Sequence, residues 1–190
     1  MKKKYQAVVV GASMGGMQAL KILLGQLPEH FQLPVIVVQH QVADADGFLV
    51  NYLNRQCKIR VKEACLNEII LASNVYISPP AYHLLIEEER TFSLSVDLPV
   101  NYSIPSIDVL FESAADVYGE HLVGVILTGA NSDGSQGLDK IKKAGGLTLV
   151  QDPTTAEAPE MPNSAIQATK IDHILGIEKI GVFLRGLADD

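Results

Sequence analysis

The chain has 190 residues, 47% of them hydrophobic, and a formal net charge of −7. This profile suits one globular domain with a sizeable core and excludes a largely disordered chain. The acidic balance gives no support to a nucleic-acid partner, and no apolar run is long enough to predict a signal peptide or a membrane span, so we expect a cytoplasmic protein.

Short apolar runs alternate with segments of helical period along most of the chain. Strands are predicted at 6–10, 35–39, 123–127 and 147–150, because these runs lack in/out alternation, as in parallel strands covered on both faces. Helices are predicted at 16–26, 46–56, 107–119, 134–144 and 177–187. This rhythm is typical of an α/β fold with a doubly wound, mainly parallel sheet in a Rossmann-like, three-layer arrangement.

The middle of the chain departs from this rhythm. Residues 75–78, 83–88 and 91–96 are short, β-rich and closely spaced, which predicts a strand followed by an antiparallel hairpin that turns near Glu89-Arg90. Residues 152–163 contain three prolines and little periodicity, so we expect a loop there. No linker or repeat divides the chain, and residues 1–190 are expected to form a single domain.

The first predicted strand runs into a glycine-rich turn around Ser13, and a predicted helix follows. Residues 11–15 match the pattern G-x-S-x-G in its strand–turn–helix setting, which presents a serine hydroxyl as a nucleophile. Free N–H groups at the start of the helix can stabilise an oxyanion. Serine is also a favoured helix N-cap, and glycine-rich turns bind nucleotides in similar folds, so the motif alone leaves these roles open.

Two further residue types of a catalytic triad follow predicted strands. His40 follows the second strand, and Asp133 follows the strand at 123–127. Sites in parallel α/β sheets lie at the carboxyl ends of strands, so we expect His40 beside Ser13 as its base, with Asp133 accepting the Nδ1 proton. The alternatives are a histidine that only closes a strand and an aspartate that caps the helix from Gly134. The order Ser, His, Asp differs from that of the α/β-hydrolase fold.

Several spaced blocks together resemble the catalytic domain of the chemotaxis protein-glutamate methylesterases (CheB). These blocks are VVVGASMGG (8–16), VVQH (37–40), YISPP (76–80), PSIDVLFESAA (105–115), GVILTGANSDGSQGL (124–138) and MPNSAI (161–166). The resemblance covers almost the whole chain, and the family's triad falls on Ser13, His40 and Asp133. It also implies a parallel sheet with an antiparallel hairpin, in agreement with the predicted elements.

The resemblance implies a serine hydrolase that removes methyl groups from glutamate γ-methyl esters on the cytoplasmic helices of chemoreceptors, as part of phosphorelay signal transduction. Some members of the family also deamidate receptor glutamines. The oxyanion is expected near Met14 and around Gly129 and Ala130, and Met161 and Pro162 are further candidates at the cleft. Neither a metal nor an organic cofactor is required.

The chain departs from the family pattern at four points. Typical members carry an N-terminal receiver domain, whereas here the first strand begins within a few residues of Met1, so a receiver is expected only as a separate protein. Met14 replaces the usual threonine, Ala130-Asn131 replaces a Met-Gly pair, and Ile104 replaces an arginine. We therefore expect retained esterase chemistry with altered contacts to an acidic receptor helix.

Two other functions fit parts of the pattern. The glycine turn around Ser13 resembles that of dinucleotide-binding oxidoreductases, but the second strand ends in Gln39-His40 in place of a ribose-binding acidic residue, and the chain has no Tyr-x-x-x-Lys. A non-catalytic family member would instead bind a signalling partner through the inherited cleft. The changes at Met14 and Ala130 motivate this second alternative.

A metal site is a third alternative. His40, Asp44 and Asp46 could supply nitrogen and oxygen ligands, although the segment from Asp44 also resembles the capped start of the next helix. Cys57 and Cys65 belong to no Cys-x-x-Cys motif or Cys/His cluster, so they predict neither a disulfide nor a metal site.

His83 and the other three histidines have no triad-like position, and we expect them to be structural or surface residues. Asp108 is expected in the first turn of a helix, where a carboxylate interacts favourably with the helix dipole. This position predicts a structural role for Asp108 as well.

Overall fold

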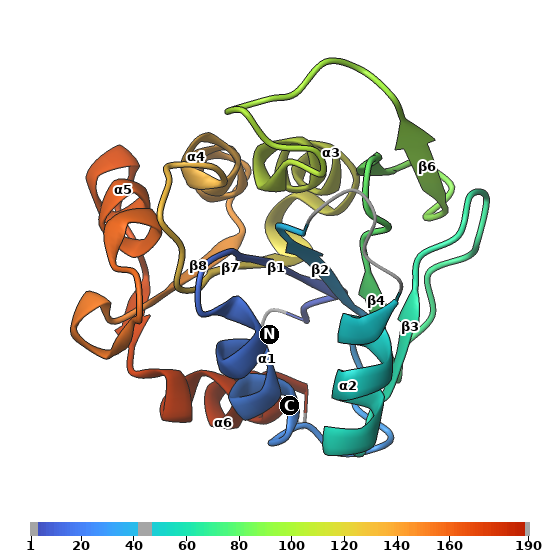
Figure 1. The fold of residues 1–190 in the computed structure, drawn as a ribbon, viewed down its shortest axis with the longest axis horizontal. Helices are drawn as coiled ribbons and strands as arrows, with labels where there is room; N and C mark the ends of the chain where they lie inside the picture. The colour runs from blue at the N-terminus through green and yellow to red at the C-terminus, as the bar shows by residue number, and fades with distance from the viewer. Residues whose placement is uncertain (1–3, 42–46, 189–190) are drawn as a thin grey trace.

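A computed structural model describes residues 4–41 and 47–188 of the chain and is drawn in Figure 1. Its central strands are β1 (Ala7–Ala12), β2 (Val35–Gln39), β3 (Arg60–Glu63), β4 (Asn74–Ile77), β7 (Leu122–Ile126), β8 (Leu147–Gln151) and β9 (His173–Leu175). They form one seven-stranded sheet in the order β3-β4-β2-β1-β7-β8-β9, and all neighbouring strands are parallel. The predicted doubly wound sheet is therefore confirmed.

Helices cover the sheet on both faces (Figure 1). One layer holds α1 (Gly16–Leu24), α2 (Phe48–Gln56) and α6 (Ile177–Ala188), and the other holds α3 (Ile107–Tyr118), α4 (Ser135–Lys143) and α5 (Glu160–Ala168). Short 3-10 turns, η1 (Gly119–His121) and η2 (Pro153–Thr155), join some of these elements. Among the described residues, no helix is long and apolar enough to cross a membrane.

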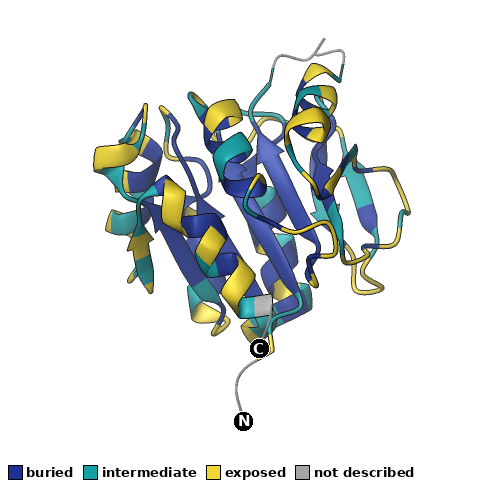
Figure 2. Cartoon of the chain, turned by 90° about the horizontal axis from the view of Figure 1, so that it is seen from below, coloured by how far each residue is buried: buried dark blue, intermediate teal, exposed yellow. Residues whose placement is uncertain are grey.

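The strands are apolar on both sides because each side packs against a helical layer. Val8 and Val10 of β1 belong to the core beneath α1 and α6, whereas Ala7 and Val9 belong to the core beneath α3 and α4. All residues of β1, β2 and β7 are buried, and Figure 2 shows these strands enclosed by helices that are exposed on their outer sides. The continuous apolar runs in the sequence follow from this double coverage.

The predicted hairpin is also confirmed. Strands β5 (His83–Ile86) and β6 (Phe92–Ser95) pair in antiparallel orientation as a separate two-stranded sheet. Arg90 has a φ of 59°, in the left-handed region that tight turns use. The hairpin packs against α3, with Leu84 and Phe92 in the same apolar cluster as Phe111.

The loop predicted over 152–163 was wrong in its second half, because α5 begins at Glu160. Proline is tolerated in the first turn of a helix, where its missing N–H has no intrahelical partner, so Pro162 does not interrupt α5. Met161, Pro162 and Ala165 are buried and fix this helix on the sheet. The edge strands β3 and β9 were not predicted, because each has at most four residues and neither is an apolar run.

The central strands create a crevice at their carboxyl ends. β1 pairs with β2 on one side and with β7 on the other. The chain therefore leaves β1 toward one half of the sheet and later returns to the other half. In open α/β sheets, ligands bind where the strand order reverses in this way.

Helices α3 and α4 pack closely above this crevice, and Gly137 lies at their contact. A Cβ at Gly137 would lie 2.5 Å from Cβ of Phe111 and 3.2 Å from the backbone of Asp108. The absence of a side chain at Gly137 thus permits the two helices to approach each other.

Replacing Gly137 by Ala is expected to lower the free energy of unfolding by about 1–3 kcal/mol, because the added methyl group overpacks the contact between α3 and α4. Gly186→Ala in α6 is the matched control, since a Cβ there meets nothing within 4 Å. Its higher helix propensity should raise stability by up to about 1 kcal/mol. Urea unfolding of both variants makes the comparison, and equal changes would contradict the close packing.

Candidate active site

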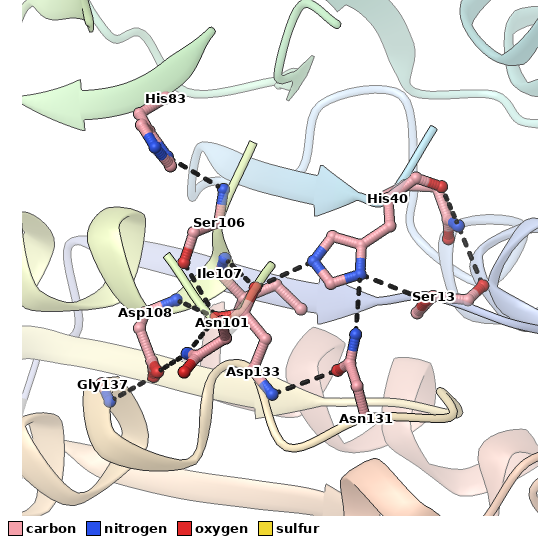
Figure 3. Close-up of polar contacts among 11 residues, drawn as sticks. Ser13, His40, His83, Asn101, Ser106, Ile107, Asp108, Asn131, Asp133 and Gly137 are labelled. Atoms are coloured by element: carbon pink, nitrogen blue, oxygen red, sulfur yellow. Dashed lines mark hydrogen bonds and ion pairs between the residues drawn. The ribbon is translucent and has the colours of Figure 1, made fainter. Parts of the chain in front are cut away.

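Ser13 lies at the carboxyl end of β1, in the turn that leads to α1. Its backbone N–H donates to the carbonyl of Thr128, at 3.0 Å, which ties the turn to the end of β7. The N-cap of α1 is Gly15, with a φ of 75°, and no side chain caps this helix. Ser13 is thus no helix cap, and the structure leaves its hydroxyl directed at His40 (Figure 3).

Glycines allow the turn to sit against its neighbours. A Cβ on Gly11 would overlap the side chain of Ile107, and one on Gly16 would overlap the side-chain amide of Gln39. The positive φ of Gly15 is a conformation that L side chains rarely adopt. The glycines of the motif therefore bring the serine close to β2 and to the start of α3.

His40 follows β2 and lies beside Ser13, as predicted. Its backbone N–H donates to the carbonyl of Ala12 at 3.1 Å, and its ring Nδ1 lies 3.1 Å from Ser13 Oγ. The side-chain amide of Gln39 donates to the carbonyls of both Ser13, at 2.9 Å, and His40, at 3.1 Å. Gln39 thus fixes the two turns relative to each other, a role that the sequence pattern did not reveal.

Asp133 completes a continuous chain of hydrogen bonds, but at the other ring nitrogen from the one predicted. Its Oδ2 lies 2.8 Å from His40 Nε2 (Figure 3). The prediction that Asp133 accepts the Nδ1 proton was wrong, because Ser13 lies on the neighbouring strand and meets the ring edge nearest the backbone. Asp133 lies across the crevice, where only the far edge of the ring reaches it.

Asp133 is fully buried and accepts hydrogen bonds from the start of α3. Its donors are the backbone N–H groups of Ile107 (2.7 Å) and Asp108 (3.1 Å), the hydroxyl of Ser106 (2.8 Å) and the amide of Asn101 (3.1 Å). Burial raises the pKa of Asp133, but the hydrogen bonds from His40 and these groups outweigh it and hold the pKa below its usual range.

The alternative in which Asp133 caps α4 was wrong. The N-cap of α4 is Gly134, and no side chain caps it. Asp133 instead caps α3, while Asp108 of α3 accepts the backbone N–H of Gly137 in α4 at 2.7 Å. Helix α3 therefore donates N–H groups to Asp133, which lies just before α4, and α4 donates an N–H group to Asp108 of α3.

Asp108 is buried and belongs to the same network, which extends its predicted structural role. Asn101 Nδ2 lies 2.7 Å from Asp108 Oδ2 and thereby links the two carboxylates. Burial has the largest effect on the pKa of Asp108 and raises it, the bond from Gly137 lowers it, and the charge of Asp133 raises it. Together these effects place the pKa at about 6. Asp108 is thus a carboxyl group that titrates close to neutral pH.

Backbone N–H groups near Ser13 are available to a ligand. Those of Met14 and Ala130 make no hydrogen bond to another described residue. The N–H of Gly129 donates to the carbonyl of Ala158, and the carbonyl of Gly129 accepts from Met161. Of the predicted oxyanion and cleft candidates, Met14 and Ala130 thus have backbone N–H groups with no partner among the described residues, whereas Gly129 and the buried Met161 bond within the loop.

Two polar residues outside the predicted site also contact it. His83 is buried, accepts the backbone N–H of Ser106 on Nδ1 and donates from Nε2 to the carbonyl of Leu98, at 3.2 Å in both cases. The amide of Asn131 reaches His40 Nδ1. Neither set of contacts could be predicted from the sequence, because Leu98, Ser106 and Asn131 lie outside the helices and strands, in segments without a periodic pattern.

The metal alternative involves His40, Asp44 and Asp46. Within residues 4–41 and 47–188, no group of three His, Cys, Asp or Glu side chains could hold a metal ion. Asp44 and Asp46, together with the capped helix start expected there, lie outside the described residues. The helix α2 begins at Phe48, after Gly47 in the left-handed conformation.

Comparisons with known proteins agree with the geometry. The family model described as CheB methylesterase matches residues 8–184. The chain belongs to the CheB methylesterase family. The crystal structure of the Thermotoga maritima CheB methylesterase catalytic domain superposes with a TM-score of 0.93, at 32% identity, and the match covers 97% of this chain and 99% of that one.

Relatives in the CheB family differ in length. A protein of Leptospira interrogans, provisionally named protein-glutamate methylesterase/protein-glutamine glutaminase, is 54% identical over 95% of this chain and 94% of its own length. Protein-glutamate methylesterase/protein-glutamine glutaminase 2 of Anaeromyxobacter dehalogenans is 40% identical over 97% of this chain, which corresponds to 54% of that protein. The chain therefore spans nearly all of the first relative and about half of the second.

Protonation of Asp108 should make stability depend on pH. Because the folded-state pKa of about 6 exceeds the ordinary value of 3.8, the contribution of Asp108 is complete below pH 3.8 and is lost as pH rises through 6. The unfolding free energy of the wild type, relative to Asp108→Asn, should fall across this window by up to about 3 kcal/mol. Urea unfolding at several pH values tests this, and a constant difference would contradict it.

Proposed function

We propose that this chain is a protein-glutamate methylesterase in which Ser13 is the nucleophile, His40 the general base and Asp133 the group that orients His40. The observation that carries the proposal is the unbroken path from Ser13 Oγ through both ring nitrogens of His40 to Asp133, with distances of 3.1 Å and 2.8 Å. Membership of the CheB methylesterase family supports the same reaction. A non-catalytic binder would have no need to retain this contact geometry.

The substrate is a glutamate γ-methyl ester on the cytoplasmic helices of a chemoreceptor. As Ser13 Oγ attacks the ester carbonyl carbon, its proton passes to His40 Nδ1, and the carbonyl oxygen becomes an oxyanion. The imidazolium then returns this proton to the departing methoxide, which leaves as methanol. A water molecule attacks the acyl-enzyme with His40 again as base, and this step releases the glutamate and restores Ser13.

The surrounding groups stabilise the charges that form along this path. The free backbone N–H groups of Met14 and Ala130 are the donors we assign to the oxyanion, because they border the nucleophile and have no partner among the described residues. Asp133 stays ionised and stabilises the imidazolium, since its lowered pKa keeps the negative charge at neutral pH. These steps require protein groups and water only.

The same site suits a second reaction. Deamidation of a receptor glutamine passes through the same acyl-enzyme, with ammonia in place of methanol as the leaving group. The relatives from Leptospira interrogans and Anaeromyxobacter dehalogenans carry protein-glutamine glutaminase in their names. We therefore propose glutaminase activity for the same triad, with receptor helices as the partner and the cytoplasm as the location.

Ser13→Ala should lower methanol release from a methylated receptor cytoplasmic fragment by roughly 10³-fold or more, because the nucleophile is lost while the binding groups remain. Release of labelled methanol is the measurement, and ammonia release from receptor glutamine should fall in parallel. Ser132→Ala, an exposed serine in the loop before Asp133, is the matched control and should retain activity. Equal turnover by wild type and Ser13→Ala would refute the assignment of the nucleophile.

A further inference from the structure

Asn131 places its side-chain amide beside the base of the triad. Its Nδ2 lies 3.3 Å from His40 Nδ1, and its Oδ1 accepts the backbone N–H of Asp133 at 3.1 Å (Figure 3). The second bond fixes which end of the amide faces His40, because a flipped amide would set its NH₂ group against the N–H of Asp133. Asn131 is therefore a hydrogen-bond donor to Nδ1.

Two donors reach the single lone pair of Nδ1. Ser13 Oγ lies 3.1 Å from this nitrogen and the amide of Asn131 lies 3.3 Å from it. The proton of the neutral ring is on Nε2, where the carboxylate of Asp133 accepts it. Once Nδ1 takes the proton of Ser13, it becomes a donor itself and faces the N–H of Asn131. The contact with Asn131 therefore exists only while Nδ1 is unprotonated.

We propose that Asn131 is a positioning residue that holds His40 in the form with Nδ1 unprotonated, and that it gives up its bond when the Ser13 proton is transferred. The proposal rests on the proposed role of His40 as base. A hydrogen bond to the neutral form of a base disfavours its charged form. Asn131 thus favours the form of the ring in which Nδ1 can accept the proton of Ser13.

This device belongs to the side chain of Asn131. A residue without a side-chain donor at this position could not donate to the ring. The loop that carries Asn131 is short and anchored at both ends. The N–H of Gly129 donates to the carbonyl of Ala158, and the buried carboxylate of Asp133 accepts backbone N–H groups at the start of α3. The amide is therefore held in place from two sides.

Few charged groups face His40 within the described part of the chain. Asp133 is in contact with the ring, and Asp108 is linked to Asp133 through Asn101. Asp108 titrates in the pH range of interest, so the measurements are repeated in an Asp108→Asn background. Asp44 and Asp46 follow His40 in the sequence but lie outside the described residues, and Asn substitutions at both provide a second background.

The pH dependence of kcat/KM for methanol release tests the proposal, because its acid limb reports the base of the free enzyme. Asn131→Ala removes the donor, whereas Asn131→Asp keeps the acceptor for the N–H of Asp133 and puts an acceptor where the donor stood. We expect the acid limb to move to higher pH by about half to one unit in Asn131→Ala and further in Asn131→Asp. The exposed Asn51→Asp is the matched control and should leave the limb in place.

Nitrogen NMR of the His40 ring in resting protein gives a second readout that needs no turnover. We expect the Nε2–H form of the ring in the wild type. The pH at which the ring gains its second proton should be lowest in the wild type, higher in Asn131→Ala and highest in Asn131→Asp. If the wild type releases no methanol but this order holds, the proposed esterase activity is overturned and the role of Asn131 is supported. The proposed role of Asn131 would be overturned by an unchanged or reversed order, or by an equal loss of kcat at every pH in Asn131→Ala.

Discussion

The proposed site depends on a buried carboxylate, that of Asp133, at the point where two helices and His40 meet. A buried charge is costly unless donors surround it, and Asp133 accepts from the ring of His40, from the start of α3 and from Ser106. Because Asp108 in turn holds the N–H of Gly137, α3 and α4 are capped by each other's segments. The network that orients the base is therefore also the network that docks two helices.

The sequence predicted the central strands, and it predicted that Ser13, His40 and Asp133 lie close together at the carboxyl ends of these strands. Apolar runs located the central strands, and the carboxyl ends of adjacent parallel strands bring Ser13, His40 and Asp133 together. Periodicity did not predict α5, because its prolines resemble those of a loop, or the short edge strands. The sequence also could not predict which ring nitrogen of His40 faces Ser13 and which faces Asp133, because this depends on how far Asp133 lies from β2 in the folded structure.

Polar residues of the network were missed for a related reason. Gln39, Asn101 and Asn131 each have one amide partner that is distant in the sequence. Ser13 is 26 residues from Gln39, Asp133 is 32 from Asn101, and His40 is 91 from Asn131. A pattern search detects residue types at strand ends, but an amide in a loop has no signature of its own.

The contact between Ser13 and Nδ1 determines which ring atom an affinity label would meet. A reagent that anchors at Ser13 and carries an alkylating group would find Nδ1 facing it, while Nε2 is engaged by the buried carboxylate of Asp133. In a triad of the opposite arrangement the same reagent would modify Nε2. The ring atom that carries the label would therefore identify the nitrogen of His40 that faces Ser13.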